Sequence, residues 1–439
     1  MAREMKDSGI PWIGEIPSDW DVSTLGKFIS IDSGISVGKK YEPETPLVEV
    51  PYLRVANVQG DHLDLSDVAT IWVTPEEAEK YRLKPGQLLM TEGGDRDKLG
   101  RGCLWNGEIE GCIHQNHVFA VQTDNRLLVR YLDYLTTSEV ARIYFDVTAK
   151  KTTNLACTSK SMIQRFAIPI PKVSEQEAIV AYLDMRCVEI DAVLAKIRTS
   201  IEEYKKLKQA IITQAVTKGI RGDRSMKESG IEYIGKIPAD WEICRLRNIG
   251  YVQNGISKSG NFFGSGFPFV SYGDVYKNMS LPFEVKGLVE SDDEERERYS
   301  VKAGDIFFTR TSETINEVGL SSVCLQSIPN ATFAGFLIRV RPFHEELDIR
   351  FSKYYFRSRH HRTYFAKKMN LVTRASLGQD LLKSLPVLIP TKQEQISIAD
   401  YLDNKCSQID SLINKKEQIL VNLSSYKMSL IYECITGRR

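Results

Sequence analysis

The chain has 439 residues, of which 42% are hydrophobic and 26% are charged, and its formal net charge is +1. This length allows two to four domains that each bury a core of their own. No run of about 18 apolar residues occurs, so a membrane span is not expected, and the polar N-terminus shows no secretory signal. The near-neutral charge argues against a wholly basic nucleic-acid coat but leaves local basic patches open. The eight cysteines form no CxxC spacing, which indicates free thiols in a reducing cytoplasm.

A long internal repeat is the strongest pattern in the chain. The opening segment Ser8–Trp20 (SGIPWIGEIPSDW) returns as Ser229–Trp241 (SGIEYIGKIPADW), and Gln176–Asp184 (QEAIVAYLD) returns as Gln395–Asp403 (QISIADYLD). The ends of the two copies match well, whereas their middles differ. A period of this length predicts two domain-sized units and not a solenoid array. A shared frame with divergent middles favours a protein that recognises two different targets with one scaffold.

In chain order, each copy opens with an Ile-Pro-x-Asp-Trp turn and continues into short strands and turns. The expected strands and short helix of the first copy are 51–55, 74–83 (helix), 87–90 and 117–121. Those of the second copy are 267–272, 291–301 (helix), 305–309 and 336–340. Both short helices begin with a residue suited to cap an N-terminus, followed by acidic residues. Each middle is therefore predicted to be α+β.

Each copy ends in a long helix, which begins after Pro171 in the first and after Pro390 in the second. Apolar residues recur along both helices at alternating steps of four and three, as in a coiled-coil seam. The seam residues are Ile179, Leu183, Cys187, Ile190, Leu194, Ile197, Ile201, Tyr204 and Ile211, then Ile398, Leu402, Cys406, Ile409, Ile413, Leu420, Leu423 and Leu430. Lys416 interrupts the second seam. Such narrow seams favour antiparallel pairing of the two helices, and the alternative is that each helix packs on its own domain.

The expected fold class is therefore α+β, with two pseudo-two-fold related α/β domains separated by a long antiparallel two-helix coiled coil. The expected limits are 1–168 for the first domain, 169–222 for the first helix, 223–387 for the second domain and 388–439 for the second helix.

Catalytic motifs are scarce. No GxGxxG motif opens a helix, and no Asn/Asp-Pro-Pro-aromatic tetrapeptide of an amino-methyltransferase is present, so an enzyme is not expected. Cys103, Cys112, His114 and His117 could suggest zinc, but their spacing fits no usual pattern. A metal-dependent enzyme is therefore a weaker alternative, and no metal site is predicted.

The stretch 350–374 carries the strongest local charge, with eight Lys or Arg, interleaved aromatic residues and no acidic residue. A helix with its aromatic residues inward and its bases outward would face DNA phosphates. The equivalent stretch 130–151 is milder. The loops after strands 87–90 and 305–309 differ in sequence, as expected if each reads its own bases, although a flexible hairpin is the alternative. The predicted DNA contacts are Lys39, Lys40, Arg96, Lys98, Arg101, Lys150, Lys151, Lys258, Arg310, Thr311, Ser312, Thr314, Asn316, Arg357, Arg359, Lys367, Lys368 and Arg374.

This arrangement resembles the specificity (S) subunit of type I restriction–modification systems. The resemblance rests on the duplicated opening SGI-x-x-IG-x-IP-x-DW, on segments 84–89 and 302–307, and on the Pro-x-x-x-Glu-Gln start of each long helix. It implies that each middle is a target-recognition domain for one half of a split double-stranded DNA site. It also implies that the helices form the spacer and dock two methyltransferase (M) subunits, with restriction (R) subunits joining in turn.

By the same resemblance, adenine methylation with S-adenosylmethionine and cleavage driven by ATP and Mg belong to those partners. This chain is then expected to be a non-catalytic cytoplasmic protein without a cofactor or membrane contact. The alternative function is a two-headed coiled-coil scaffold for proteins that does not bind DNA.

Overall fold

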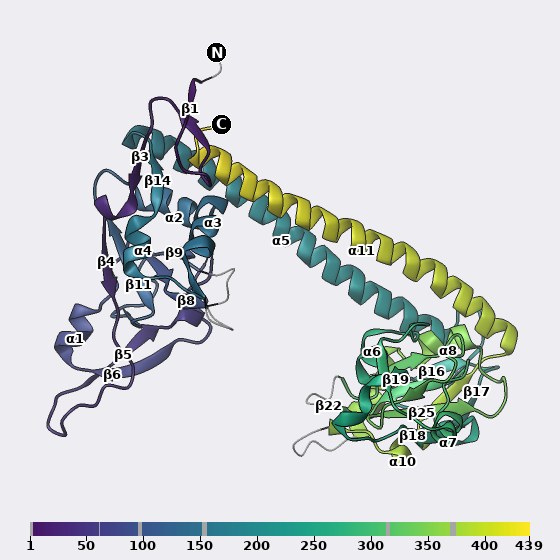
Figure 1. Cartoon of the computed structure of the whole chain (residues 1–439). Helices are drawn as coiled ribbons and strands as arrows, with labels where there is room; N and C mark the ends of the chain where they lie inside the picture. The colour runs from purple at the N-terminus through teal and green to yellow at the C-terminus, as the bar shows by residue number, and fades with distance from the viewer. Residues whose placement is uncertain (1–2, 61, 95–98, 152–155, 313–316, 369–374) are drawn as a thin grey trace. The chain divides into compact units, whose positions relative to one another are not determined.

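A computed structural model of the chain describes residues 3–60, 62–94, 99–151, 156–312, 317–368 and 375–439 (Figure 1). They form two compact units, the first of residues 1–198 with 418–439 and the second of residues 199–417. Two long helices, α5 (Val173–Lys218) and α11 (Lys392–Ile435), contribute to both units. We call the rest of each unit its head. None of the helices in the described segments combines the length and apolar character that a membrane span requires.

The first head is built around a four-stranded antiparallel sheet in the order β4-β11-β7-β9. Its strands are β4 (Ile29–Ser33), β11 (Val118–Thr123), β7 (Gln87–Thr91) and β9 (Gly102–Trp105). Alternate residues of a strand face opposite sides of a sheet. Leu88 and Met90 of β7 accordingly join the main core with helix α2 (Val129–Thr137), whereas Leu89 joins a smaller core with Trp105. Because both faces of β7 are covered, its three central residues, Leu88 to Met90, are apolar in succession.

Smaller sheets complete the first head, in the orders β10-β5-β6, β12-β13-β8, β1-β2 and β14-β3. Their strands are β1 (Met5–Asp7), β2 (Glu15–Pro17), β3 (Asp21–Thr24), β5 (Val48–Leu53), β6 (Ala69–Val73), β8 (Gly93–Gly94), β10 (Ile113–His114), β12 (Lys150–Lys151), β13 (Ala156–Cys157) and β14 (Ala167–Ile170). The other helices are α1 (Pro75–Lys80), α3 (Glu139–Thr148) and α4 (Lys160–Arg165).

The second head repeats this topology, with sheets β18-β25-β21-β23, β20-β19-β24, β17-β27, β15-β16 and β22-β26. The strands are β15 (Met226–Glu228), β16 (Lys236–Pro238), β17 (Glu242–Arg245), β18 (Gly250–Asn254), β19 (Phe263–Val270), β20 (Gly287–Val289), β21 (Ile306–Thr309), β22 (Thr311–Ser312), β23 (Ser321–Val323), β24 (Thr332–Phe333), β25 (Leu337–Pro342), β26 (Ala375–Ser376) and β27 (Pro386–Ile389). The helices are α6 (Tyr272–Lys277), α7 (Asp293–Arg298), α8 (Ile349–Tyr355), α9 (Arg359–Lys368) and α10 (Gln379–Lys383). The prediction of two α+β domains is confirmed, while their exact limits stay a prediction.

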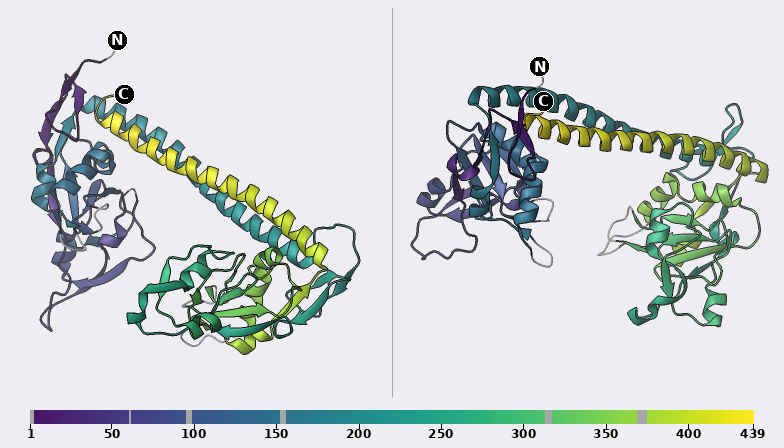
Figure 2. Two further views of the ribbon diagram at one scale, coloured as in Figure 1. Left: turned by 45° about the vertical axis from the view of Figure 1, so that its right-hand side comes forward. Right: turned by 45° about the horizontal axis from the view of Figure 1, so that its top comes forward.

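Within each unit, α5 and α11 lie side by side and run antiparallel (Figures 1 and 2). In the first unit Asp191 pairs with Lys427 at 2.7 Å, and in the second unit Asp410 pairs with Lys208 at 2.6 Å. The two aspartates are corresponding residues of the repeat, and so are the two lysines, so one ion pair occurs in each unit. The buried seam residues are Leu183, Cys187, Ile190, Leu194, Ile201, Ile398, Leu402, Cys406, Ile409, Ile413 and Leu430. The predicted coiled coil is confirmed.

Lys416, which interrupts the apolar seam of α11, has a specific aromatic partner on α5. The Lys416 Nζ lies 5.6 Å from the centroid of the Tyr204 ring on α5, in the same unit. A cation over the face of an aromatic ring is attracted by its quadrupole, at about 0.5–1 kcal/mol when exposed. The aromatic ring therefore allows a lysine at a seam position that elsewhere requires an apolar residue.

The opening motif is tied to the first turn of the long helix of its own copy. In the first unit Trp20 Nε1 donates to Glu175 at 2.7 Å, and Arg3 pairs with both Glu175 and Asp19. Arg3 holds the pKa of Asp19 below its usual range through a side-chain hydrogen bond. We call this cluster the tryptophan clamp. It gives the sequence-distant Asp-Trp and Glu-Gln motifs a common structural role.

The second unit contains the same tryptophan clamp in a more buried form. Trp241 Nε1 donates to Glu394 at 2.9 Å, and Arg224 pairs with Glu394 and with Asp240. The side chains of Arg224 and Glu394 are 10% and 4% exposed, against 38% and 26% for Arg3 and Glu175. Desolvation raises the energetic importance of keeping such charges paired.

The glutamine that follows the clamp glutamate joins three backbone segments. Gln176 Oε1 accepts from the Leu128 N–H at 2.8 Å, and its Nε2 donates to the carbonyls of Arg126 and Pro171 at 2.9 and 3.0 Å. Gln395 makes the equivalent three bonds in the second unit. Both glutamines are fully buried, so satisfied hydrogen bonds are required of them.

We predict that Glu394→Ala lowers the free energy of unfolding of the second unit by about 3 kcal/mol, because it removes the buried partner of Arg224, leaves that charge with only the exposed Asp240, and leaves Trp241 Nε1 without its acceptor. Glu175→Ala is the matched control in the first unit, where the more exposed Arg3 regains water and the loss is about 1–2 kcal/mol. Chemical denaturation of the full-length protein measures both. Equal losses would show that burial of the clamp does not set its contribution.

Candidate nucleic-acid interface

Short strand pairings bring together regions that the sequence presents as separate candidates for DNA binding. In the first head β13 pairs with both β8 and β12, so Gly93–Gly94 and Lys150–Lys151 belong to one small sheet. In the second head β22 pairs with β26, so Thr311–Ser312 lie beside Ala375–Ser376. We call these two sheets the recognition sheets. Each joins the loop that follows the central strand β7 or β21 to the segment that follows the basic stretch.

One residue at the edge of each recognition sheet has the same backbone bonds in both heads. The Glu92 N–H donates to the His117 carbonyl at 2.9 Å, and the Arg310 N–H donates to the Phe336 carbonyl at 3.0 Å. The carbonyls of Glu92 and Arg310 each accept a bond of 2.7 Å from the residue after β13 or β26. Glu92 and Arg310 are therefore structural equivalents that differ in chemistry.

Part of the predicted contact set cannot be placed on these sheets. Arg96, Lys98, Thr314, Asn316 and Arg374 lie outside the described residues. For Lys151 and Ser312 the strand backbone is described but not the side chain.

The remaining candidates of the first head lie in different surroundings. Lys39 and Lys40 belong to the loop between β4 and β5, where both are exposed. Lys39 forms an ion pair with Glu77. Burial raises the pKa of Glu77, but hydrogen bonds from Lys39 and a nearby tyrosine outweigh it and lower that pKa to about 2. Lys150 is exposed on β12, and Arg101 is half-buried with its stem beside Gly60.

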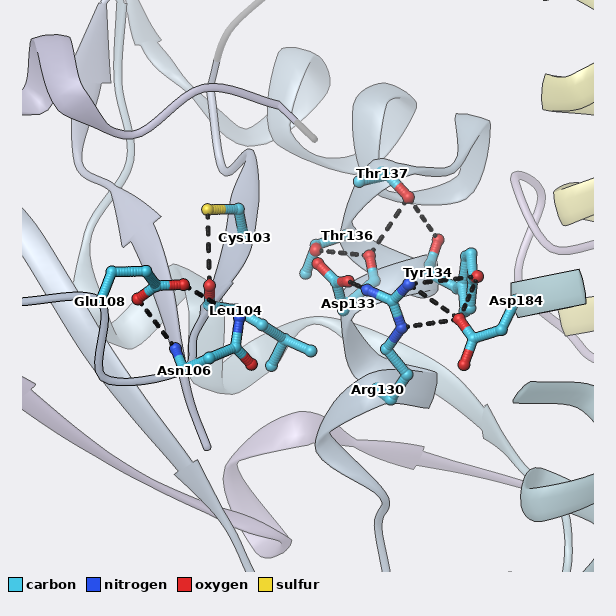
Figure 3. A network of polar contacts seen from close by, with 10 residues as sticks. All are labelled: Cys103, Leu104, Asn106, Glu108, Arg130, Asp133, Tyr134, Thr136, Thr137 and Asp184. Carbon is cyan, nitrogen blue, oxygen red and sulfur yellow. Dashed lines mark hydrogen bonds and ion pairs between the residues drawn. The ribbon is translucent and has the colours of Figure 1, made fainter. Parts of the chain in front are cut away.

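In the second head, the basic stretch turns several of its cations toward the protein. Arg350 and Lys353 pair with Asp403 of α11, and Arg362 donates to the Val318 carbonyl. The absence of acidic residues within the stretch is thus offset by carboxylates from a distant helix. The first head has the same arrangement. There Arg130 contacts Asp184 of α5 at 2.8 Å and Asp133 at 2.6 Å (Figure 3).

Arg357 corrects the expectation of an outward basic face. Its guanidinium donates to the carbonyls of Tyr276, Ser321 and Val275 at 2.6, 2.7 and 3.1 Å. Burial lowers the pKa of Arg357. The prediction that this side chain faces outward is therefore wrong, because carbonyls at the end of helix α6 and at the start of strand β23 accept its hydrogen bonds.

The other candidate DNA contacts of the second head differ in their exposure and in their ion pairs. Arg359 and Lys368 are exposed, and Lys367 is exposed but pairs with Glu232 at 2.8 Å. Lys258 pairs with Glu295 at 2.6 Å, which ties the loop after β18 to α7. Arg310 and Thr311 are half-buried at the recognition sheet. DNA contact by each of these residues stays a prediction.

The residues of the zinc alternative have other partners. His114 Nδ1 lies 2.6 Å from the Val118 carbonyl, and His117 Nδ1 lies 2.6 Å from Glu92 Oε2. Cys103 and Cys112 are buried. No three His, Cys, Asp or Glu side chains of the described segments are grouped as a metal site would require.

Comparison with known proteins decides the family. The family model for the type I restriction modification DNA specificity domain matches residues 238–421. The putative type I restriction enzyme MjaX specificity subunit of Methanocaldococcus jannaschii is 26% identical, over 97% of this chain and 95% of that protein. The EcoKI specificity subunit of Escherichia coli K12 is 21% identical, over 97% of this chain and 90% of that protein. The chain belongs to the type I restriction–modification specificity subunits.

The fold of this specificity subunit agrees with that assignment. A solved structure described as the basis of complex assembly and conformational transition of the type I R-M system has a TM-score of 0.72 to this chain. The match covers 96% of this chain and 98% of that chain at 16% sequence identity. At this identity the likeness concerns the fold.

Sequence reasoning missed one pair at the first recognition sheet. Glu92 and His117 lie on different elements, and His117 entered only as a member of the zinc alternative. The repeat held a signal, because His117 precedes β11 as Phe336 precedes β25. Aligning the two copies strand by strand would have placed His117 beside Glu92 and Phe336 beside Arg310.

The basic stretch of this specificity subunit contains a buried histidine pair. His360 and His361 are 4% and 1% exposed, and their ring centroids are 3.8 Å apart. Burial lowers the pKa of His360 to about 3 and that of His361 well below 6.5. Both rings are therefore neutral in the folded second head.

We predict that the free energy of unfolding of the second unit falls as the pH drops from about 6.5 toward 3. In this window the unfolded chain takes up protons that the folded head excludes, at up to about 1.4 kcal/mol per pH unit for each histidine. The first head has Val140 and Ala141 at these positions, so the variant His360→Val/His361→Ala should flatten the slope. Denaturation at several pH values measures it, and an unchanged slope would contradict the assignment.

Proposed function

We propose that this specificity subunit reads a bipartite double-stranded DNA site, with one half-site for each head. The observation that supports this is the pair of recognition sheets, which have matching backbone bonds but unlike side chains at equivalent positions. A common frame with different hydrogen-bonding groups is what two separate half-sites require. Exposed cations such as Arg359 and Lys368 would contact phosphates, and residues on the recognition sheets would contact base edges.

The long helices are the proposed spacer and the docking element for two M subunits, with R subunits joining the complex. Their support is the continuous antiparallel pairing found in each unit. We further propose that the chain itself performs no chemistry. S-adenosylmethionine, Mg and ATP would bind to the partner subunits, where adenine methylation and cleavage take place.

Selection from random DNA duplexes tests this function directly. The full-length chain, purified with its methyltransferase subunit, should enrich a consensus of two short defined segments separated by a fixed number of unspecified bases. Two heads with different recognition sheets should give two unlike segments. A single segment, or no enrichment, would contradict the proposal.

Removing exposed positive charges tests the alternative that the chain is a protein scaffold that does not bind DNA. Arg359→Ser/Lys368→Ser should weaken DNA binding and reduce the salt dependence of log K by about 2, because each phosphate contact contributes roughly 0.9 to that slope. The matched control is Lys286→Ser/Arg298→Ser, which removes two other exposed cations of the same head. Unchanged affinity and slope in the first variant would favour the scaffold alternative.

A further inference from the structure

The two equivalent positions at the recognition sheets present opposite hydrogen-bonding chemistry. The first head has Glu92 beside His117, and the second head has Arg310 beside Phe336. In both heads the first residue donates its backbone N–H to the carbonyl of the second, so the two side chains of each pair start from neighbouring backbone. The comparison between heads therefore isolates a difference in side-chain chemistry on one frame.

The pair of the first head presents acceptors. His117 Nδ1 lies 2.6 Å from Glu92 Oε2, and a carboxylate can only accept, so Nδ1 carries the hydrogen. In the neutral ring Nε2 is then an acceptor, as is the other Glu92 oxygen. The His117 side chain is 55% exposed and the Glu92 side chain is 31% exposed, so a ligand can reach both.

The pair of the second head presents donors beside an apolar surface. The Arg310 guanidinium has five N–H donors and no acceptor. Phe336 is 65% exposed, a larger fraction than Phe262 or Phe263 of the same head. An aromatic ring held this far out of the core beside an arginine indicates a contact that covers it.

These groups match base edges better than the phosphate backbone. A carboxylate near phosphates is repelled, so Glu92 is unfavourable at a DNA surface unless a base donor satisfies it. In the major groove the exocyclic amino groups of cytosine and adenine are donors, whereas guanine offers two acceptors that arginine binds bidentately. Thymine adds a methyl group that apolar side chains contact.

We propose that these pairs determine sequence specificity. Glu92 with His117 accepts from the amino group of a cytosine or adenine in one half-site, and Arg310 donates to a guanine in the other, with Phe336 packed on the adjoining base. This inference rests on the proposed function and assigns the chemistry of one base to each head.

The test repeats the duplex selection with Glu92→Ala and Arg310→Ala, each in the full chain with its methyltransferase subunit. Glu92→Ala should reduce the preference for cytosine or adenine at one position of one half-site by roughly 5- to 100-fold. Arg310→Ala should reduce the preference for guanine at one position of the other half-site to the same degree. Exposed residues of the same kinds, changed in Glu76→Ala and Arg298→Ala, are the controls and should leave the consensus unchanged.

A transplanted pair gives a gain-of-function version of the test. Glu92→Arg/His117→Phe should move the preference in the first half-site to guanine, with the second half-site unchanged. If the wild-type chain gives a bipartite consensus and none of these variants alters it, the inference is overturned while the proposed function stands. If the wild-type chain gives no consensus, the proposed function itself fails. Should Arg310→Ala not fold, Phe336→Ala tests the same position through an exposed side chain.

Discussion

The tryptophan clamp is the contact on which each unit depends. In the first unit the Trp20 indole donates to Glu175 at the start of α5, and Gly437 at the end of α11 packs against the same ring. Gly437 has a φ of 69°, and a Cβ there would lie 3.1 Å from the indole and 2.4 Å from Pro17. One indole thus fixes the beginning of one long helix and the end of the other. This explains why the opening motif and the helix starts are repeated so faithfully.

The second unit applies the same rule with the roles of the helices exchanged. Trp241 donates to Glu394 at the start of α11, and Gly219 ends α5 beside that ring with a φ of 74°. The antiparallel direction follows, because each unit must receive one helix start and one helix end. The ion pairs along the helices add only modest energy, since exposed pairs contribute about 0.2–1 kcal/mol. The buried seam and the clamps therefore define the pairing.

A fixed frame makes divergence at the recognition sheets tolerable. The buried glutamines and the clamps satisfy their own hydrogen bonds without help from the loops that follow β7 and β21. Half-buried positions such as Glu92 and Arg310 contribute their backbone to the sheet and leave their side chains to vary. Two heads can in this way keep one fold and present different chemistry.

Local patterns in the sequence are enough to predict the duplication, the α+β class of the heads and the coiled coil. These follow from periodicities and turn residues that act over a few positions, and the seam from Leu183 to Leu194 is buried as its spacing predicts. Which charged side chains remain available for binding depends on their three-dimensional packing. Arg357 and Lys353 look alike in the sequence, yet Arg357 bonds to backbone carbonyls of α6 and β23, whereas Lys353 pairs with Asp403, fifty residues away. The same holds for Glu92 and His117, because an electrostatic partner is chosen by proximity in space, which local sequence patterns do not encode.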